Sequence, residues 1–128
     1  MDSKKAINDS LLEEMLYFSL KESVEFAKTS NDDFFNVVQK KVELKYWGEN
    51  ERKEGFSDFL ASKVMNPVFW YISSENRLIP SNGSGKWIIK EEAKNLTDEN
   101  FKDISKKIFK EYEIYLKSNF KIKGYEVN

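Results

Sequence analysis

The side chains that could do chemistry in this sequence are carboxylates, lysines and hydroxyls, because the chain contains no histidine and no cysteine. That composition excludes a Ser-His-Asp triad, a cysteine nucleophile, an imidazole base and a zinc site of Cys and His ligands. One carboxylate pattern has the spacing found in metal-dependent nucleases, since Asp33 precedes Glu43 and Lys45. In such enzymes two carboxylates hold Mg²⁺ and the lysine assists the attacking water.

The second half of that pattern is an E-x-K triplet, which is common in a chain so rich in both residues. About two such triplets are expected by chance from 15 Glu and 19 Lys, and three occur. The nuclease interpretation also requires residues 42–46 to form a strand. We therefore expect no catalytic residue, no metal and no cofactor, and we keep a carboxylate- or metal-dependent nuclease as the least favoured alternative.

A glycine-rich segment, Asn82–Lys86, carries the glycines and the lysine that a phosphate-binding loop uses. Such a loop also needs a Ser or Thr after the lysine and then a helix. Here Trp87 follows the lysine, and strand-like residues come next. The segment therefore predicts a tight turn without a phosphate site.

The charge balance does not favour binding to nucleic acid. With 21 basic and 22 acidic residues the net charge is −1, whereas proteins that bind DNA or RNA usually carry a clearly basic face. Three helices followed by a hairpin would still be compatible with a winged-helix protein, with residues 56–65 as the recognition helix. The last helix adds a lysine flank, interleaved with acidic residues, at Lys102, Lys106 and Lys110. This is the second alternative.

Aromatic residues are abundant, at 15% of the chain. Trp47 stands at the edge of a charged loop and Trp87 beside a Gly-Ser turn, and exposed tryptophans near loops are typical interface anchors. The only two arginines, Arg52 and Arg77, also fall in expected loops, and the planar guanidinium suits bidentate pairing. We predict that these four residues contact a partner. The alternative is that the tryptophans fill the core, which we favour for Trp70.

Helical spacing dominates the first half of the chain. Residues 10–28 predict a helix, because Ser10 and Glu13 make a capping-box pattern ahead of an apolar stripe. The acidic segment 29–33 signals the start of a second helix, which we extend to about residue 45. Residues 42–47 also alternate with period two, so a strand stays open there.

A third, short helix is expected over residues 56–64. It should end at Asn66, since the residue before a proline is pushed out of helical geometry. The last helix is the clearest, because Thr97 is placed to cap it, and Leu96 and Phe101 occupy the two positions of a hydrophobic staple.

Residues 68–72 are apolar, β-branched and aromatic, and they predict a strand covered on both faces. The turn at 82–85 and the apolar residues that follow it predict a hairpin over 68–90. We therefore expect an α+β fold with N-terminal helices, a small and mostly antiparallel sheet, and a long C-terminal helix packed on it. An edge strand is expected at 120–127.

The length of 128 residues argues for one domain, residues 1–128, with residues 1–9 disordered. No run approaches about 18 uncharged apolar residues, so we expect no membrane span and a cytoplasmic protein. Without a catalytic pattern, the expected function is that of a small soluble module that binds another protein and acts by occlusion. Immunity proteins, antitoxins and phage inhibitors work in this way. A monomer and a homodimer are both compatible with the sequence.

Overall fold

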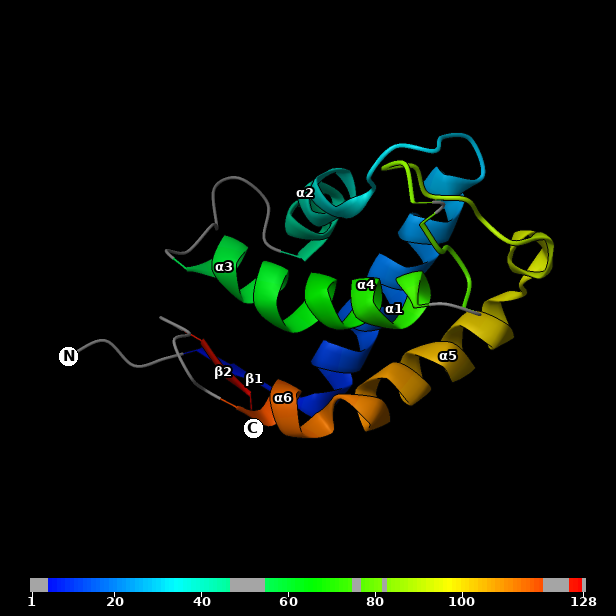
Figure 1. Ribbon diagram of the computed structural model, residues 1–128. Coiled ribbons are helices and arrows are strands. Elements are labelled where there is room, and N and C mark those ends of the chain that lie inside the picture. Colours follow the sequence, from blue (N-terminus) through cyan, green and yellow to red (C-terminus); the bar gives the residue numbers. More distant parts are fainter. Residues whose placement is uncertain (1–4, 47–54, 75–76, 82, 119–124, 128) are drawn as a thin grey trace.

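The computed structural model describes residues 5–46, 55–74, 77–81, 83–118 and 125–127. Within these ranges the protein is mainly helical (Figure 1). The strands are β1 (Lys5–Ile7) and β2 (Tyr125–Val127). The helices are α1 (Asp9–Ala27), α2 (Phe35–Tyr46), α3 (Phe56–Leu60), η1 (Ala61–Met65), α4 (Asn66–Ser73), η2 (Glu91–Asn95), α5 (Asp98–Glu111) and α6 (Glu113–Lys117).

Helix α1 forms the centre of the fold. Its buried side carries eight residues, among them Leu12, Leu16, Leu20 and Val24, which repeat every four positions as the sequence predicts. The helix packs against α2, α5 and the segment from η1 to α4. The expected cap at Ser10 is wrong, because Asn8 accepts the backbone N–H of Leu11 at 2.8 Å and the helix begins at Asp9.

Helices α3, η1 and α4 follow one another without a break and form one rod, drawn in green in Figure 1. The expected end at Asn66 is wrong, since this residue keeps helical backbone angles. η1 is a π-helix, and the N–H of Asn66 bonds to the carbonyl oxygen of Ala61, five residues back. A wide turn leaves one backbone position without its usual partner. Proline lacks an N–H, so Pro67 fits directly after it.

The strand predicted over residues 68–72 is therefore wrong, because these residues belong to α4. Val68 and Ile72 are buried together, as residues four apart on one helix face must be. An apolar run of this length does not distinguish a buried strand from a buried helix, and here the rod that begins at Phe56 decides between them.

The predicted hairpin over 68–90 is also wrong as a pair of strands. Gly83 and Gly85 have positive φ, so the turn itself is confirmed. Among the described residues, its two arms pair through an isolated bridge between Ser81 and Trp87 and through two backbone hydrogen bonds, Ile88 N–H to Pro80 O and Lys90 N–H to Leu78 O. The arms form a loop that covers one end of the helices.

The α+β expectation is contradicted, since the only sheet in the described part of the chain is the parallel pair β1 and β2. Lys5 pairs with Tyr125 and Ile7 with Val127. Residues 5–9, part of the segment expected to be disordered, thus take part in the fold. The expected edge strand at 120–127 is found at its end, while residues 119–124 lie outside the described ranges.

The C-terminal helix begins as predicted. The hydroxyl of Thr97 accepts the N–H of Asn100, and the side chain of Asn100 accepts the N–H of Thr97, which completes a capping box. The helix changes direction at Tyr112, where α5 ends and α6 begins. Its buried side lies against α1, antiparallel to it, because Asp98 contacts Tyr17 while Lys117 contacts Asp9.

The correction at the start of α1 leads to a prediction. Asn8→Ala should lower the free energy of unfolding by about 1 kcal/mol, because the N-terminal N–H groups of the helix lose their side-chain acceptor. Ser10→Ala should change it by less than about 0.5 kcal/mol, since Ser10 is exposed and does not cap the helix. Urea denaturation of the two variants measures the difference, and an equal effect of both substitutions would contradict the assigned cap.

Candidate functional site

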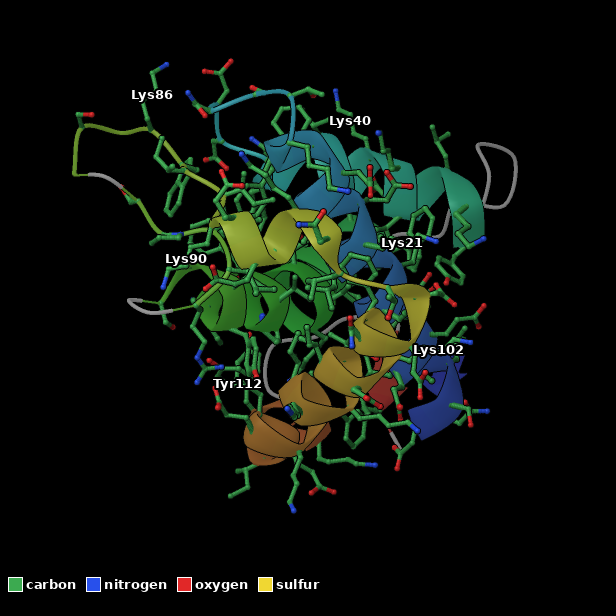
Figure 2. All side chains as sticks on the ribbon, turned by 90° about the vertical axis from the view of Figure 1, so that its right-hand side faces the viewer. Lys21, Lys40, Lys86, Lys90, Lys102 and Tyr112 are labelled. Carbon is green, nitrogen blue, oxygen red and sulfur yellow. The ribbon has the colours of Figure 1, made fainter. Side chains whose placement is uncertain are left out.

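A group of aromatic side chains meets where α4 lies against the junction of α5 and α6. Trp70 contacts Tyr112, with ring centroids 5.8 Å apart, and Tyr115, at 5.2 Å and nearly edge-to-face. Trp70 stays 40% exposed, a large fraction for so apolar a side chain. Figure 2 shows Tyr112 at the end of the C-terminal helix, near the green ribbon of α4. We call Trp70, Tyr112 and Tyr115 the aromatic cluster.

Tyr115 is fixed by polar contacts to the π turn of the rod. Its hydroxyl donates to the backbone oxygen of Ser62 at 2.8 Å and lies 2.8 Å from the Ser62 hydroxyl. Its backbone oxygen accepts a hydrogen bond from the ammonium of Lys63. Because both ends of Tyr115 are held, the rotamer of the ring that touches Trp70 is restricted.

Lys63 is unusual because it is a lysine with only 2% of its surface exposed. Its Nζ lies 4.4 Å from the centroid of the Tyr115 ring, and it bonds to a carbonyl in the last turn of α6, where the helix dipole favours a cation. Burial lowers the pKa of Lys63. The ammonium therefore acts as a buried tie between η1 and α6.

Arg77 lies on one flank of the aromatic cluster. Its guanidinium carbon stands 3.9 Å from the centroid of the Tyr71 ring, and its Nη2 is 3.3 Å from Oε1 of Glu111. Both charged side chains are more than one third exposed, so the ion pair adds little stability. The structure thus places Arg77, one of the predicted interface residues, against Tyr71 and Glu111, the chain neighbours of Trp70 and Tyr112.

The other predicted interface residues are not part of this group. Trp47 and Arg52 lie outside the described residues. Trp87 is half-buried and packs against the rings of Phe34 and Phe69, with centroids 6.0 and 5.0 Å away. Its backbone N–H donates to Asn31 O at 2.9 Å, which ties the loop to the start of α2. These contacts give Trp87 a structural role, and its part in an interface stays a prediction.

The three residues of the nuclease pattern, Asp33, Glu43 and Lys45, have separate surroundings in the structure. Asp33 accepts the N–H of Phe35 at 2.9 Å, and Glu43 is only 8% exposed on α2. Lys45 lies over the ring of Phe18, at 5.0 Å. Residues 42–46 are helical, which settles the open choice between helix and strand. No group of three or more acidic side chains in the described part of the chain could hold a metal ion.

The structure does not support the winged-helix alternative, because the expected hairpin is not formed. Residues 68–73 are helical, and the two arms of the loop at 78–90 are not strands. Lys63, expected on the exposed side of the recognition helix, is buried. The glycine-rich turn offers no free lysine either, since Lys86 forms an ion pair with Asp32 at 3.1 Å.

A second surface feature is a hollow of about 380 Å³ between α1 and α5. Tyr17 donates a hydrogen bond to Asp98 at one end of it, which raises the pKa of Tyr17 and lowers that of Asp98. Its lining carries charges of both signs: Ser10, Glu13, Glu14, Tyr17, Lys102, Ser105 and Lys106. The hollow is open, and in the described residues none of the buried polar atoms that lack a hydrogen-bond partner belongs to its lining.

Comparisons with protein-family models, with curated proteins and with solved structures give no match to this chain. None of the helices in the described residues is long and apolar enough to cross a membrane.

Sequence reasoning missed Trp70 because it assigned the wrong period to residues 68–72. In a strand Val68, Trp70 and Ile72 share a face, whereas in a helix Trp70 lies about 200° from both. With Val68 and Ile72 buried, the helix turns Trp70 outward. The helical spacing from Phe56 to Val64, continued across the proline, was the signal that could have found it.

The packing of Trp87 predicts its effect on stability. Trp87→Ala should lower the free energy of unfolding by about 3 kcal/mol, since the ring contacts Phe34 and Phe69 and its loss leaves a cavity. The neighbouring Ile88, 41% exposed, is the matched control, and Ile88→Ala should cost less than about 1 kcal/mol. Chemical denaturation tests this, and equal stabilities of the two variants would contradict the structural role.

The buried tie predicts a pH dependence. Because the folded pKa of Lys63 is lowered, the unfolded chain binds more protons in the alkaline range, so this residue makes stability rise with pH up to the ordinary lysine value of about 10.4. The unfolding free energy of wild type minus that of Lys63→Met should therefore increase as the pH rises through that range. A difference that does not change with pH would refute the assignment.

Proposed function

We propose that the protein binds another protein and blocks a surface of it, and that the aromatic cluster with Arg77 is the centre of the contact. The observation that carries the proposal is the 40% exposure of Trp70 between two tyrosines. Trp, Tyr and Arg are the residue types that contribute most to binding energy at protein interfaces.

The energy available at Trp70 is of the right size for an anchor. A tryptophan presents roughly 250 Å² when it is fully accessible, so its exposed fraction leaves about 100 Å² to be covered by a partner. At roughly 25 cal/mol per Å², covering this area contributes about 2.5 kcal/mol. That is the range of a hot-spot residue.

The surroundings of Trp70 keep the entropic cost of binding small. Tyr115 is held at both its hydroxyl and its backbone oxygen, and Arg77 is stacked on Tyr71 and paired with Glu111. Side chains that are already ordered lose little rotamer freedom when a partner covers them. A module that acts by occlusion needs only such a pre-formed surface and no reactive group.

The test begins with a photo-crosslinking residue placed at position 70, and at position 44 as a control, in cells that make the protein naturally. Leu44 is an exposed apolar residue of α2, outside the cluster. A protein that crosslinks from position 70 and not from position 44 is then purified, and its affinity is measured by calorimetry. Trp70→Ala should weaken this affinity at least about 30-fold, the equivalent of 2 kcal/mol.

Leu44→Ala is the matched control and should leave the affinity unchanged, and circular dichroism should show that both variants are folded. A partner that binds Trp70→Ala as tightly as wild type contradicts the proposed site. If no protein crosslinks from position 70 above the level seen from position 44, the proposed function itself is wrong.

A further inference from the structure

The outer side of the C-terminal helices carries three lysines and one isoleucine. Lys106, Lys107 and Lys110 are exposed on α5, and Ile114, on α6, is 92% exposed. Lys106 and Lys110 are four residues apart on α5, on the side away from the buried Ile108, and Lys107 lies beside them. Ile114 follows on α6, beyond the bend at Tyr112. We call these four residues the ridge.

The lysines of the ridge differ from most others because they form no ion pair with any described residue. On the same two helices Lys102 pairs with Asp98, and Lys117 with Asp9. Asp103 and Glu113 lie near the ridge along the helix but do not pair with it. Three positive charges lie within five residues, so an acidic group placed directly beside them is favourable. Asp103, Glu111 and Glu113 reduce the net positive charge of the surrounding face.

The ridge borders the proposed interface. Tyr112 of the aromatic cluster lies in the chain between Lys110 and Ile114, and Glu111 connects the helix to Arg77. Along the chain, Glu111 lies between Lys110 of the ridge and Tyr112 of the aromatic cluster. A partner that covers Trp70 and extends past Arg77 therefore reaches the ridge.

We propose that the ridge binds an acidic segment of the partner protein, which also places a large apolar side chain on Ile114. This inference rests on the proposed function and names the chemistry of the partner. A peptide segment suits the face better than a phosphate array does, because its acidic residues can meet the lysines while other residues face Asp103, Glu111 and Glu113. A nucleic-acid backbone or an anionic lipid surface would bring uniform negative charge against those three carboxylates.

The proposal is tested with short random peptides displayed on phage. They are selected on the wild-type protein and depleted on a variant that combines Lys106→Glu, Lys107→Glu and Lys110→Glu. The enriched peptides should be acidic and carry a large apolar residue. One of them, made synthetically, should bind wild type at least about tenfold more tightly than either the triple variant or Ile114→Asp. Its affinity should fall as salt is added.

Matched controls come from α2, which exposes Lys40, without an ion pair to any described residue, and the aliphatic Leu44. Lys40→Glu and Leu44→Asp repeat the two kinds of substitution there and should leave peptide affinity unchanged. In Figure 2, Lys40 lies near the top of the view and Tyr112 in its lower half, on different helices. All variants alter exposed side chains, and their folding is checked by circular dichroism.

Neutral or basic peptides, acidic peptides that bind the triple variant equally well, or the absence of any enriched peptide would overturn the proposal. Preferential binding of random-sequence duplex DNA or of phosphatidylserine vesicles to wild type over the triple variant would overturn it too, because the occupant would be of another class. The outcome is separable from that of the proposed function. If the partner found from position 70 is lost on Trp70→Ala but unaffected by the triple variant, the ridge proposal fails and the proposed function stands.

Discussion

The wide turn at η1 is the constraint on which the rest of the structure depends. It lets one helical rod run from Phe56 to Ser73 through a proline that would otherwise stop or kink it. It also turns Ser62 and Lys63 toward α6, where they hold Tyr115. The direction of the rod after the turn then determines which residues of α4 are buried. Val68 and Ile72 are buried, and Trp70 faces outward.

Lys63 illustrates what such a buried charge does for a small protein. Removing an ammonium from water is costly, so a core residue of similar size could stabilise the fold as well or better. Unlike an apolar side chain, the buried ammonium needs a hydrogen-bond acceptor at a defined position. In this fold the acceptor is the backbone oxygen of Tyr115. The contact thereby specifies one position of α6 against the rod, which apolar packing alone would define less sharply.

The features that the sequence predicts well are those that depend on local chemistry. Thr97 caps α5 through the predicted pattern, the apolar stripe of α1 is buried, and the glycines at 83 and 85 make the predicted turn. The capping of α1 shows the limit of such signals, because Asn8 and Ser10 are both good capping residues and only the arrangement of the preceding strand selects between them.

The errors concern residues whose structure is decided by distant contacts. The apolar run 68–72 suits a strand and a helix equally, and the choice follows from the wide turn that precedes it. The wrong assignment of a strand also affected the candidate site, because it predicted a buried Trp70 where the structure exposes this residue. Arg77 stands out in the sequence because arginine is rare in this chain, and its part in an interface stays a prediction. The position of Tyr115 depends on Ser62 and Lys63, more than fifty positions away. No local pattern reports such a contact.

The pairing of β1 with β2 also has a consequence for the order of folding. Lys5 pairs with Tyr125 and Ile7 with Val127, so the two strands are far apart in the sequence. Contacts between distant segments carry a large loop-closure cost, so we expect this pair to form after the local turns of the helices. Ile7 is fully buried in the folded protein, and its burial is complete only once this pair has formed. Helix α6, which carries Tyr115, packs against β2, so the long-range pair also supports the surface proposed to bind a partner.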